Sequence, residues 1–309
     1  MKADDIKKVL IIGSGTMGRH IGLQHALYGY EVVFYDIDES VLEVAVTHVG
    51  KMASRLLKTG YINEEMYANV SRLITTTTDP QEASRGVQLV SESVPESIAL
   101  KQKVWSEFDK YLPADAILTT NTSTLVASMF AEASGRPERF LAWHFHLPVL
   151  TANVVDVMPH PGTDPAVTEV ILEHSRRIDQ IPIDIRIEWP NYVYNEMLTS
   201  LQSAALRLAV NNVATPEDID RAWMAIMGTN IGPFGIMDSV GVDTTYHITA
   251  QDYELHPDTP YLKEIVQFLK EKVDANELGR KTGKGFYSYP NPAYEQPDFV
   301  KRVLPKYKK

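Results

Sequence analysis

The stretch KKVLIIGSGTMGRHIGLQHALYGYEVVFYDID, residues 7–38, decides the fold of the first part of this chain. An apolar run leads into the glycine-rich segment GSGTMG at residues 13–18, and a second apolar run ends at Asp36. The order of strand, glycine turn, helix, strand and acid predicts a βαβ unit that binds a dinucleotide. A glycine turn that binds no nucleotide is the alternative, and the elements that flank this turn argue against it.

Each glycine of the segment has a physical reason. Gly13 allows the tight turn, Gly15 lets the backbone approach a pyrophosphate, and Gly18 lets the helix pack on the strand. The helix N-terminus adds amide donors and a positive dipole. The predicted cofactor-binding residues of this loop are Gly13, Gly15, Thr16, Met17 and Gly18.

Asp36 indicates which of the two nicotinamide cofactors, NAD or NADP, the protein binds. A carboxylate at the end of the second strand can accept hydrogen bonds from the adenosine ribose hydroxyls. It would repel the 2′-phosphate of NADP, and the next residues, Ile37 and Asp38, bring no arginine to receive that phosphate. The predicted cofactor is therefore NAD.

Composition sets outer limits on the function. With 309 residues and 44% hydrophobic composition, the chain can bury a large core and is expected to form two domains. A net charge of −10 argues against a nucleic-acid surface, so an anionic ligand must be met by a local group of donors. The lack of cysteine excludes disulfides and thiolate nucleophiles. We expect no signal segment, no membrane span and a cytoplasmic location.

Short apolar segments alternate with helical patterns through the first half of the chain. This alternation predicts a Rossmann-type, doubly wound α/β domain with a mainly parallel sheet. Ligands of such sheets bind at the carboxyl ends of the strands. The expected strands lie near residues 72–75, 87–91, 116–119 and 139–145, and the polar segments that follow or end them are 91–96, 120–123 and 144–146.

From about residue 190 the sequence becomes helical. The segment TPEDIDRAWMAIM (215–227), for example, begins with a capping threonine, a proline at the first helical position and two acids. We therefore predict an NAD-binding domain over residues 1–187 and an all-helical C-terminal domain over 188–309.

Three basic residues of the first domain, Lys51, Arg55 and Lys58, are spaced to share one face of a helix. A solvated helix surface is the favoured interpretation of this face, and a phosphate-binding site is the alternative.

His144 is the candidate acid/base. A nicotinamide enzyme that oxidises an alcohol needs a base for the hydroxyl proton, and histidine titrates near neutrality. Asp156 follows on the next predicted strand and can lie beside His144 to fix its tautomer. Two alternatives stay open, a purely structural His144 and a metal bound by His144 and His146, for which no third ligand with a characteristic spacing is evident.

At this point the chain resembles a known family, the 3-hydroxyacyl-CoA dehydrogenases. The stretches that carry the resemblance are PESIALK (95–101), NTSTL (121–125), HFHLPV (144–149) and GRKTGKGFYSY (279–289), in the family's order. The resemblance runs across nearly the whole chain and implies a Rossmann domain followed by a helical domain. It also implies NAD-dependent interconversion of 3-hydroxy and 3-keto acyl thioesters, and a homodimer formed through the helical domain.

The resemblance also assigns roles by position. His144 corresponds to the catalytic histidine, and Asp156 stands where the family usually has a glutamate. Ser123 and Asn195 match the two residues that contact the substrate. Glu96, Lys101, Asn121 and Lys281 fall on positions that line the cofactor. By themselves, Glu96, Lys101 and Lys281 indicate an exposed helix start, a surface lysine and part of a solvated tail.

Several residues depart from the family pattern. Asp156 is one methylene shorter than glutamate, so we expect it to reach His144 only by a backbone shift or through a water. The other departures are Leu147 in place of an asparagine, and Asn191, Tyr192 and Glu196 in place of a glycine, a phenylalanine and an arginine. These changes put the substrate in question more than the cofactor.

Two other functions therefore stay open. A related branch of gulonate and carnitine dehydrogenases and λ-crystallin acts on small polar 3-hydroxy compounds, and ESVPE (92–96) and VMPHPGTDP (157–165) resemble it. A non-catalytic NAD-binding protein, like λ-crystallin, is the second.

The segment GRKTGKG is not a P-loop, because its glycine spacing is wrong and Gly285 follows Lys284 where a serine or threonine should be. It predicts a turn and a short strand.

Overall fold

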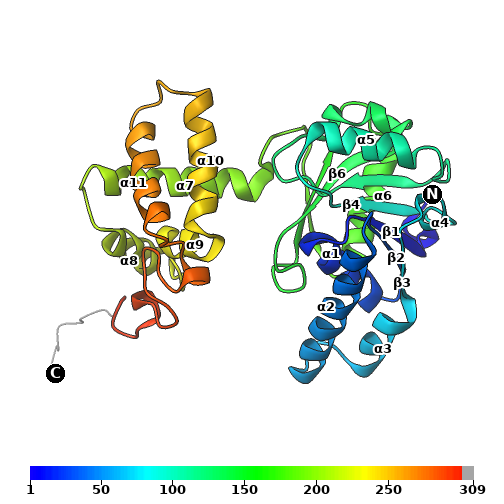
Figure 1. Ribbon diagram of the computed structural model, residues 1–309, viewed down its shortest axis with the longest axis horizontal. Helices are drawn as coiled ribbons and strands as arrows, with labels where there is room; N and C mark the ends of the chain where they lie inside the picture. The colour runs from blue at the N-terminus through cyan, green and yellow to red at the C-terminus, as the bar shows by residue number, and fades with distance from the viewer. Residues whose placement is uncertain (301–309) are drawn as a thin grey trace, which may run out of the picture. The chain divides into compact units, whose positions relative to one another are not determined.

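The computed structural model describes residues 1–300, and the chain forms two compact units, Met1–Tyr194 and the segment from Asn195 onward (Figure 1). The first unit is an α/β unit and the second is helical. This is the fold class that the sequence predicts.

The first unit is built on one eight-stranded sheet in the order β3-β2-β1-β4-β5-β6-β7-β8. All neighbouring strands are parallel except β6 and β7, which are antiparallel. The predicted mainly parallel sheet is thus confirmed. Its strands are β1 (Lys8–Ile12), β2 (Glu31–Tyr35), β3 (Ile74–Thr77), β4 (Leu89–Glu92), β5 (Ile117–Thr120), β6 (Phe140–Phe145), β7 (Val154–Pro159) and β8 (Ile181–Asp184).

Six helices connect these strands, and polar side chains begin most of them. The side chains of Asp38, Asn63, Asp79, Ser97 and Asp164 each accept a hydrogen bond from a first-turn amide. The first helix is different, because its N-cap is Gly15, which has no side chain to accept. The helices are α1 (Thr16–Leu27), α2 (Glu39–Lys58), α3 (Glu64–Leu73), α4 (Pro80–Ala83), α5 (Ile98–Phe108) and α6 (Pro165–Arg177).

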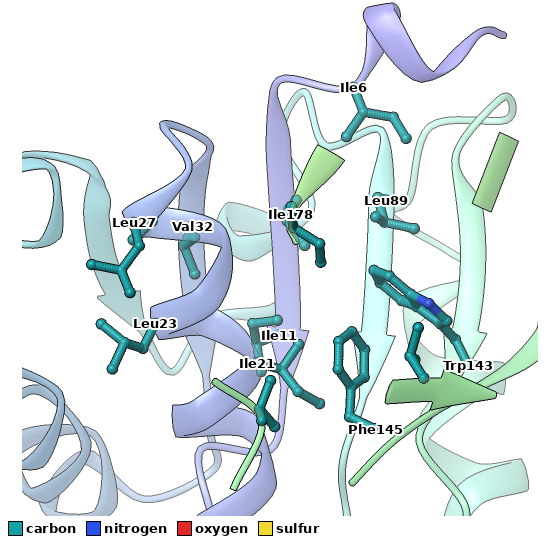
Figure 2. Packing of buried hydrophobic residues seen from close by; sticks show 14 of the residues in the cluster. Ile6, Ile11, Ile21, Leu23, Leu27, Val32, Leu89, Trp143, Phe145 and Ile178 are labelled. Carbon is teal, nitrogen blue, oxygen red and sulfur yellow. The ribbon is translucent and has the colours of Figure 1, made fainter. Parts of the chain in front are cut away.

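The sheet is buried on both faces, as a doubly wound fold requires. Alternate residues of β1 enter different clusters, since Val9 and Ile11 belong to one and Leu10 and Ile12 to the other. Figure 2 shows the first cluster, in which Ile11 packs among side chains from other elements, including Trp143 and Phe145 of β6. Because strand side chains alternate, His144, which lies between Trp143 and Phe145, faces the second cluster.

Up to residue 300, the second unit contains the rest of α7 (Tyr192–Val210), which starts in the last residues of the first unit, and four more α-helices. They are α8 (Pro216–Met227), α9 (Pro233–Val240), α10 (Val242–Leu255) and α11 (Leu262–Asp274). Thr215 caps α8 with its side chain, as its sequence predicts. Among residues 1–300, none of the helices combines the length and apolarity that crossing a membrane would need.

The GRKTGKGFYSY segment wraps around a buried carboxylate in this unit. Asp238 accepts hydrogen bonds from the amides of Phe286 and Tyr287 and from the Tyr289 hydroxyl. A Cβ at Gly285 would lie 2.1 Å from Asp238 Oδ1, so this glycine is needed for close approach. The predicted turn is present, whereas the predicted short strand is wrong, because the segment forms only isolated bridges between residues 279 and 288.

Candidate active site at the carboxyl ends of the strands

The glycine loop connects β1 to α1 and is shaped by close packing. Gly13 has a φ of +93°, and a Cβ there would lie 2.9 Å from the carbonyl oxygen of Ser93 after β4. A Cβ at Gly18 would lie 2.0 Å from the Gly13 carbonyl oxygen. Around Gly15, in contrast, a Cβ would meet no atom of residues 1–300 within 4 Å. The loop is therefore held tightly at both ends and open at Gly15, where Thr16 and Met17 begin α1.

This arrangement fits the pyrophosphate of a dinucleotide. The N-terminus of α1 has no side-chain cap, so its first amides are free to donate to an anion. Asp36 lies beside the loop, just after β2, where its Oδ2 accepts a hydrogen bond from Ser14 N at 2.9 Å. The carboxylate is thus fixed next to the turn, at the place where the ribose of NAD is expected.

His144 and Asp156 are direct neighbours across the antiparallel strands β6 and β7. The imidazole Nδ1 of His144 donates to Asp156 Oδ2 at 3.0 Å. The expected bridging water is wrong, because residues opposite each other in a ladder are close enough for the shorter aspartate to reach directly. Since Nδ1 is used, Nε2 is the ring nitrogen that remains to exchange a proton.

Burial and the hydrogen bond act against each other on the two groups. His144 is 5% exposed, and this burial lowers its pKa, while the hydrogen bond from its ring to Asp156 raises it in part. Burial raises the pKa of Asp156, but the hydrogen bonds from the imidazoles outweigh it, so that the pKa ends below its ordinary value. A neutral imidazole beside a charged carboxylate is the state of a general base ready to accept a proton.

Tyr192 covers one face of the histidine. Its ring stacks on His144 with centroids 4.6 Å apart and planes 21° from parallel. The residue is 1% exposed, so it excludes water from that face. Asn191 and Tyr192 both have a positive φ, of 66° and 60°. The family's glycine at position 191 is thus replaced by asparagine, the side chain that tolerates this conformation best.

The loop after β5 is organised by Glu96. One carboxylate oxygen of Glu96 accepts hydrogen bonds from the amides of Ser123 and Thr124 and from the Thr122 hydroxyl. Burial raises the pKa of Glu96, but these donors and the nearby Lys101 ammonium together lower it by more. The pKa therefore ends below its ordinary value, and the group is charged. Glu96 is exposed, as expected of a helix start, but its carboxylate is fixed by these donors and positions Ser123.

Lys101 is an interior residue, not a surface lysine. Its Nζ lies 2.8 and 3.0 Å from the two carboxylate oxygens of Glu92, and both residues are at most 1% exposed. Thr120 also donates to Glu92, at 2.6 Å. Asn121, next along the chain, accepts from the Phe145 amide at 2.8 Å and so ties the β5 loop to the end of β6. The cofactor roles of Lys101 and Asn121 remain predictions.

His146 also binds Asp156. Its Nε2 lies 2.9 Å from Oδ2, the same carboxylate oxygen that His144 uses. The ligand atoms of the three residues lie within 4.8 Å of one another. The third metal ligand that the sequence reasoning did not find is thus Asp156. Combining the two observations made on the sequence, the His-x-His spacing and the facing aspartate, could have found it.

Two predicted site residues lie in the second unit. Asn195 is half-buried on α7, and its backbone carbonyl accepts from the Thr199 hydroxyl at 2.8 Å. Lys281 bonds both carboxylate oxygens of Asp243 at 2.6 Å, next to the start of α10. Their roles toward substrate and cofactor remain predictions.

Comparison with known families gives two matches that together span most of the chain. Residues 8–188 match the 3-hydroxyacyl-CoA dehydrogenase NAD binding domain, and residues 192–289 match the C-terminal domain of the same family. A human relative, the mitochondrial hydroxyacyl-coenzyme A dehydrogenase, is 30% identical over 289 residues, which cover 92% of this chain and 91% of that protein.

Two solved structures are similar over 92% of this chain and 99% of their own. A diketoreductase, described as a catalyst of dicarbonyl compounds, is 34% identical with a TM-score of 0.85. The (S)-3-hydroxybutyryl-CoA dehydrogenase of Ralstonia eutropha is 28% identical with a TM-score of 0.83.

Proposed function

This chain belongs to the 3-hydroxyacyl-CoA dehydrogenase family, and from that premise we propose that His144 moves the substrate proton in an NAD-dependent oxidation of a 3-hydroxyacyl-CoA to the 3-ketoacyl-CoA, or in its reversal. The observation that carries the proposal is the His144–Asp156 pair, buried, directly hydrogen-bonded and stacked under Tyr192. NAD, when bound, accepts the hydride or returns it.

The residues of this chain then have separate tasks. His144 Nε2 takes the hydroxyl proton during oxidation and gives it back during reduction. Asp156 fixes the tautomer and stabilises the imidazolium that forms. Ser123, held by Glu96, and Asn195 are proposed to hydrogen-bond the substrate oxygens, where charge develops during hydride transfer.

We propose that NAD lies along the carboxyl ends of β1, β2 and β4. The open space at Gly15 and the uncapped α1 support the placement of its pyrophosphate there. Asp36, fixed beside the loop, supports the preference for NAD over NADP. The functional division that we propose is an NAD-binding domain over residues 1–187 and a helical domain over residues 188–309.

An acyl-CoA, with a short acyl chain, is the substrate that we favour, and a basic surface on α2 supports binding of its CoA part. Lys51, Arg55 and Lys58 line a shallow hollow on that helix. Lys51 also lines a second hollow with Thr16 and Arg19 at the glycine-loop end of α1. A protein with a net charge of −10 needs such a local group of cations to bind the phosphates of a CoA thioester.

A second substrate class is a small hydroxy or dicarbonyl compound without CoA. The 34% identity to a diketoreductase favours it, because this identity exceeds that to the CoA dehydrogenases named above. Leu147, which stands where the family has asparagine, is about half exposed beside the site and gives such a substrate an apolar wall.

The test is NADH oxidation with acetoacetyl-CoA and with matched free 3-keto acids and diketones. We expect turnover with the thioester, and we expect His144→Ala to lower it by about a hundredfold or more while NADH binding is retained. Unchanged turnover in His144→Ala would refute the acid/base role. NADH binding without turnover on any of these substrates would point to a non-catalytic protein.

Two further features belong to the same proposal, a cytoplasmic location and a homodimer through the helical domain. Large apolar side chains exposed in the second unit, among them Ile226, Met227 and Leu255, support a protein interface there. Light scattering of the purified protein tests the dimer, and cell fractionation tests the location.

A further inference from the structure

The cluster of His144, His146 and Asp156 has more ligand capacity than a general-base pair needs. Both imidazoles donate to Asp156 Oδ2, at 3.0 and 2.9 Å, while Asp156 Oδ1 is buried and has no hydrogen-bond partner within residues 1–300. A buried carboxylate oxygen without a partner is costly, and a metal ion is one way to satisfy it.

The donor set is that of a borderline transition metal. Two imidazole nitrogens and one carboxylate oxygen are common zinc ligands, and sites with three protein ligands keep a position for water or substrate. The three ligand atoms lie within 4.8 Å of one another. Ligand atoms about 2.0–2.2 Å from a tetrahedral zinc lie about 3.3–3.6 Å apart. The two nitrogen–oxygen distances of 3.0 and 2.9 Å would therefore widen by a few tenths of an ångström, and a pair 4.8 Å apart would close by about 1–1.5 Å. Mg²⁺ and Ca²⁺ prefer oxygen ligands and fit this set poorly.

We propose that His144, His146 and Asp156 form a binding site for Zn²⁺, and that an ion bound there inhibits the enzyme. The inhibition rests on the proposed function, because it requires that His144 be the acid/base, whereas the binding of zinc does not.

The inhibition follows from where the protons lie. In the metal-free pair, His144 carries its proton on Nδ1 and keeps the lone pair of Nε2 for the substrate. Zinc on Nδ1 needs the lone pair of that nitrogen, so the proton moves to Nε2. His146 changes in the same way, from a proton on Nε2 to a proton on Nδ1. No net proton is released, but Nε2 of His144 now carries a proton and cannot accept another.

The site is reachable from solvent. His146 follows the last residue of β6, its side chain is 13% exposed, and its ring meets Tyr194 edge-on. The next residue, Leu147, is 49% exposed. The cluster thus lies at the end of β6, next to exposed residues. The carboxylate of Glu96 adds negative charge toward His144.

Direct binding is measured with purified metal-free protein, titrated with Zn²⁺ against a chromophoric chelator. We expect one tight site in the wild type. His146→Phe should weaken it about a hundredfold or more, because even partners outside the coordination sphere are worth ten- to a hundredfold. His146→Asn is the second variant, since it keeps a hydrogen-bond donor for Asp156 if His146→Phe folds poorly.

His256→Gln is the matched control. His256 is exposed on the surface and lies 3.9 Å from Asp252, a helical pair that could bind zinc weakly. Removing it should leave the tight site unchanged. The proposal fails if the wild type and both His146 variants bind zinc equally, or if His256→Gln is the variant that loses the tight site.

Inhibition is measured as the ratio of turnover with and without Zn²⁺ for each variant, with Mg²⁺ as a second control. We expect micromolar or lower zinc to abolish wild-type turnover, Mg²⁺ to have no effect, and the His146 variants to resist zinc. Zinc bound tightly through His146 without inhibition would support the site and contradict the role of His144. If the wild-type protein neither binds zinc nor is inhibited by it, but His144→Ala loses activity, the role of His144 is supported and the zinc site is contradicted.

Discussion

Asp156 stands directly opposite His144 in the antiparallel register of β6 and β7, and its Oδ2 accepts the Nδ1 proton at 3.0 Å. Side chains that face each other across such a ladder have Cβ atoms only about 4.5–5.5 Å apart. The short aspartate therefore fits this gap, whereas the glutamate usual in the family has an extra methylene to accommodate in a position that is 1% exposed.

Asp156→Glu is accordingly expected to lower kcat about tenfold, because the longer side chain must fold back and displaces the imidazole. Asp156→Asn should lower it about a hundredfold, since a neutral amide no longer stabilises the imidazolium. Steady-state NADH formation at saturating substrate measures both. The idea of a length-matched pair is wrong if Asp156→Glu turns over at the wild-type rate.

The parts of the site that could be predicted are those fixed by local sequence. The glycine loop needs a strand, a tight turn, the approach of Gly18 to the Gly13 carbonyl and a helix start, all within residues 8–27. The His144–Asp156 pair was also accessible, because two strands joined by a short connection pair with each other. In both cases the deciding residues lie close together in the chain.

The rest depends on burial and on pairings that the sequence pattern does not show. Lys101 reads as a surface lysine until β4 and α5 place Glu92 against it in the interior. The length of Asp156 does not show how far it reaches, because its reach depends on the register that puts it opposite His144. The sharing of one Asp156 oxygen by two histidines requires that register as well.

The buried Lys101–Glu92 pair leads to a stability prediction. Lys101→Met keeps the length of the side chain but leaves the Glu92 carboxylate buried without its cation, which should cost about 3–5 kcal/mol of unfolding free energy. Urea denaturation followed by circular dichroism measures the loss. Lys103→Met, on an exposed position of the same helix, is the control and should change the free energy by less than about 0.5 kcal/mol. Equal effects in the two variants would contradict the pairing.

The close approach of residues 279–289 to Asp238 leads to a second stability prediction. Gly285→Ala places a Cβ 2.1 Å from Asp238 Oδ1, and the carboxylate must move away from the three groups that donate to it. We expect a loss of about 2–4 kcal/mol, measured by thermal unfolding. Gly50→Ala is the matched control, because it lies within α2 with nothing within 4 Å of the new Cβ. It should be neutral or stabilise by up to about 1 kcal/mol.

A buried histidine pair outside the site sets the acid stability of the first unit. Nδ1 of His25 lies 2.8 Å from the Ile21 carbonyl oxygen and therefore carries the proton. Its Nε2 then accepts a hydrogen bond from Nε2 of His174 at 3.1 Å, and both residues are fully buried. A proton added to either ring would have no acceptor, so the pair is neutral.

Burial lowers the pKa of His25 to about 4, against an ordinary value of 6.5, and also lowers that of His174. The unfolded chain protonates His25 near pH 6.5, whereas the folded chain does so only near pH 4, and the pKa of His174 is shifted in the same direction. Unfolding free energy should therefore fall as the pH drops through this window, by about 3 kcal/mol for His25, and level off below it. Urea titrations between pH 7 and 4 measure the slope.

His174→Gln removes one of the two titrating groups and keeps an N–H that can donate to His25, so its slope over pH 6.5 to 4 should be shallower than that of the wild type. His256→Gln, which removes an exposed histidine, should leave the slope unchanged. A wild-type protein whose stability is flat between pH 6.5 and 4, or a slope that responds to His256 and not to His174, would show that the buried pair does not govern acid unfolding.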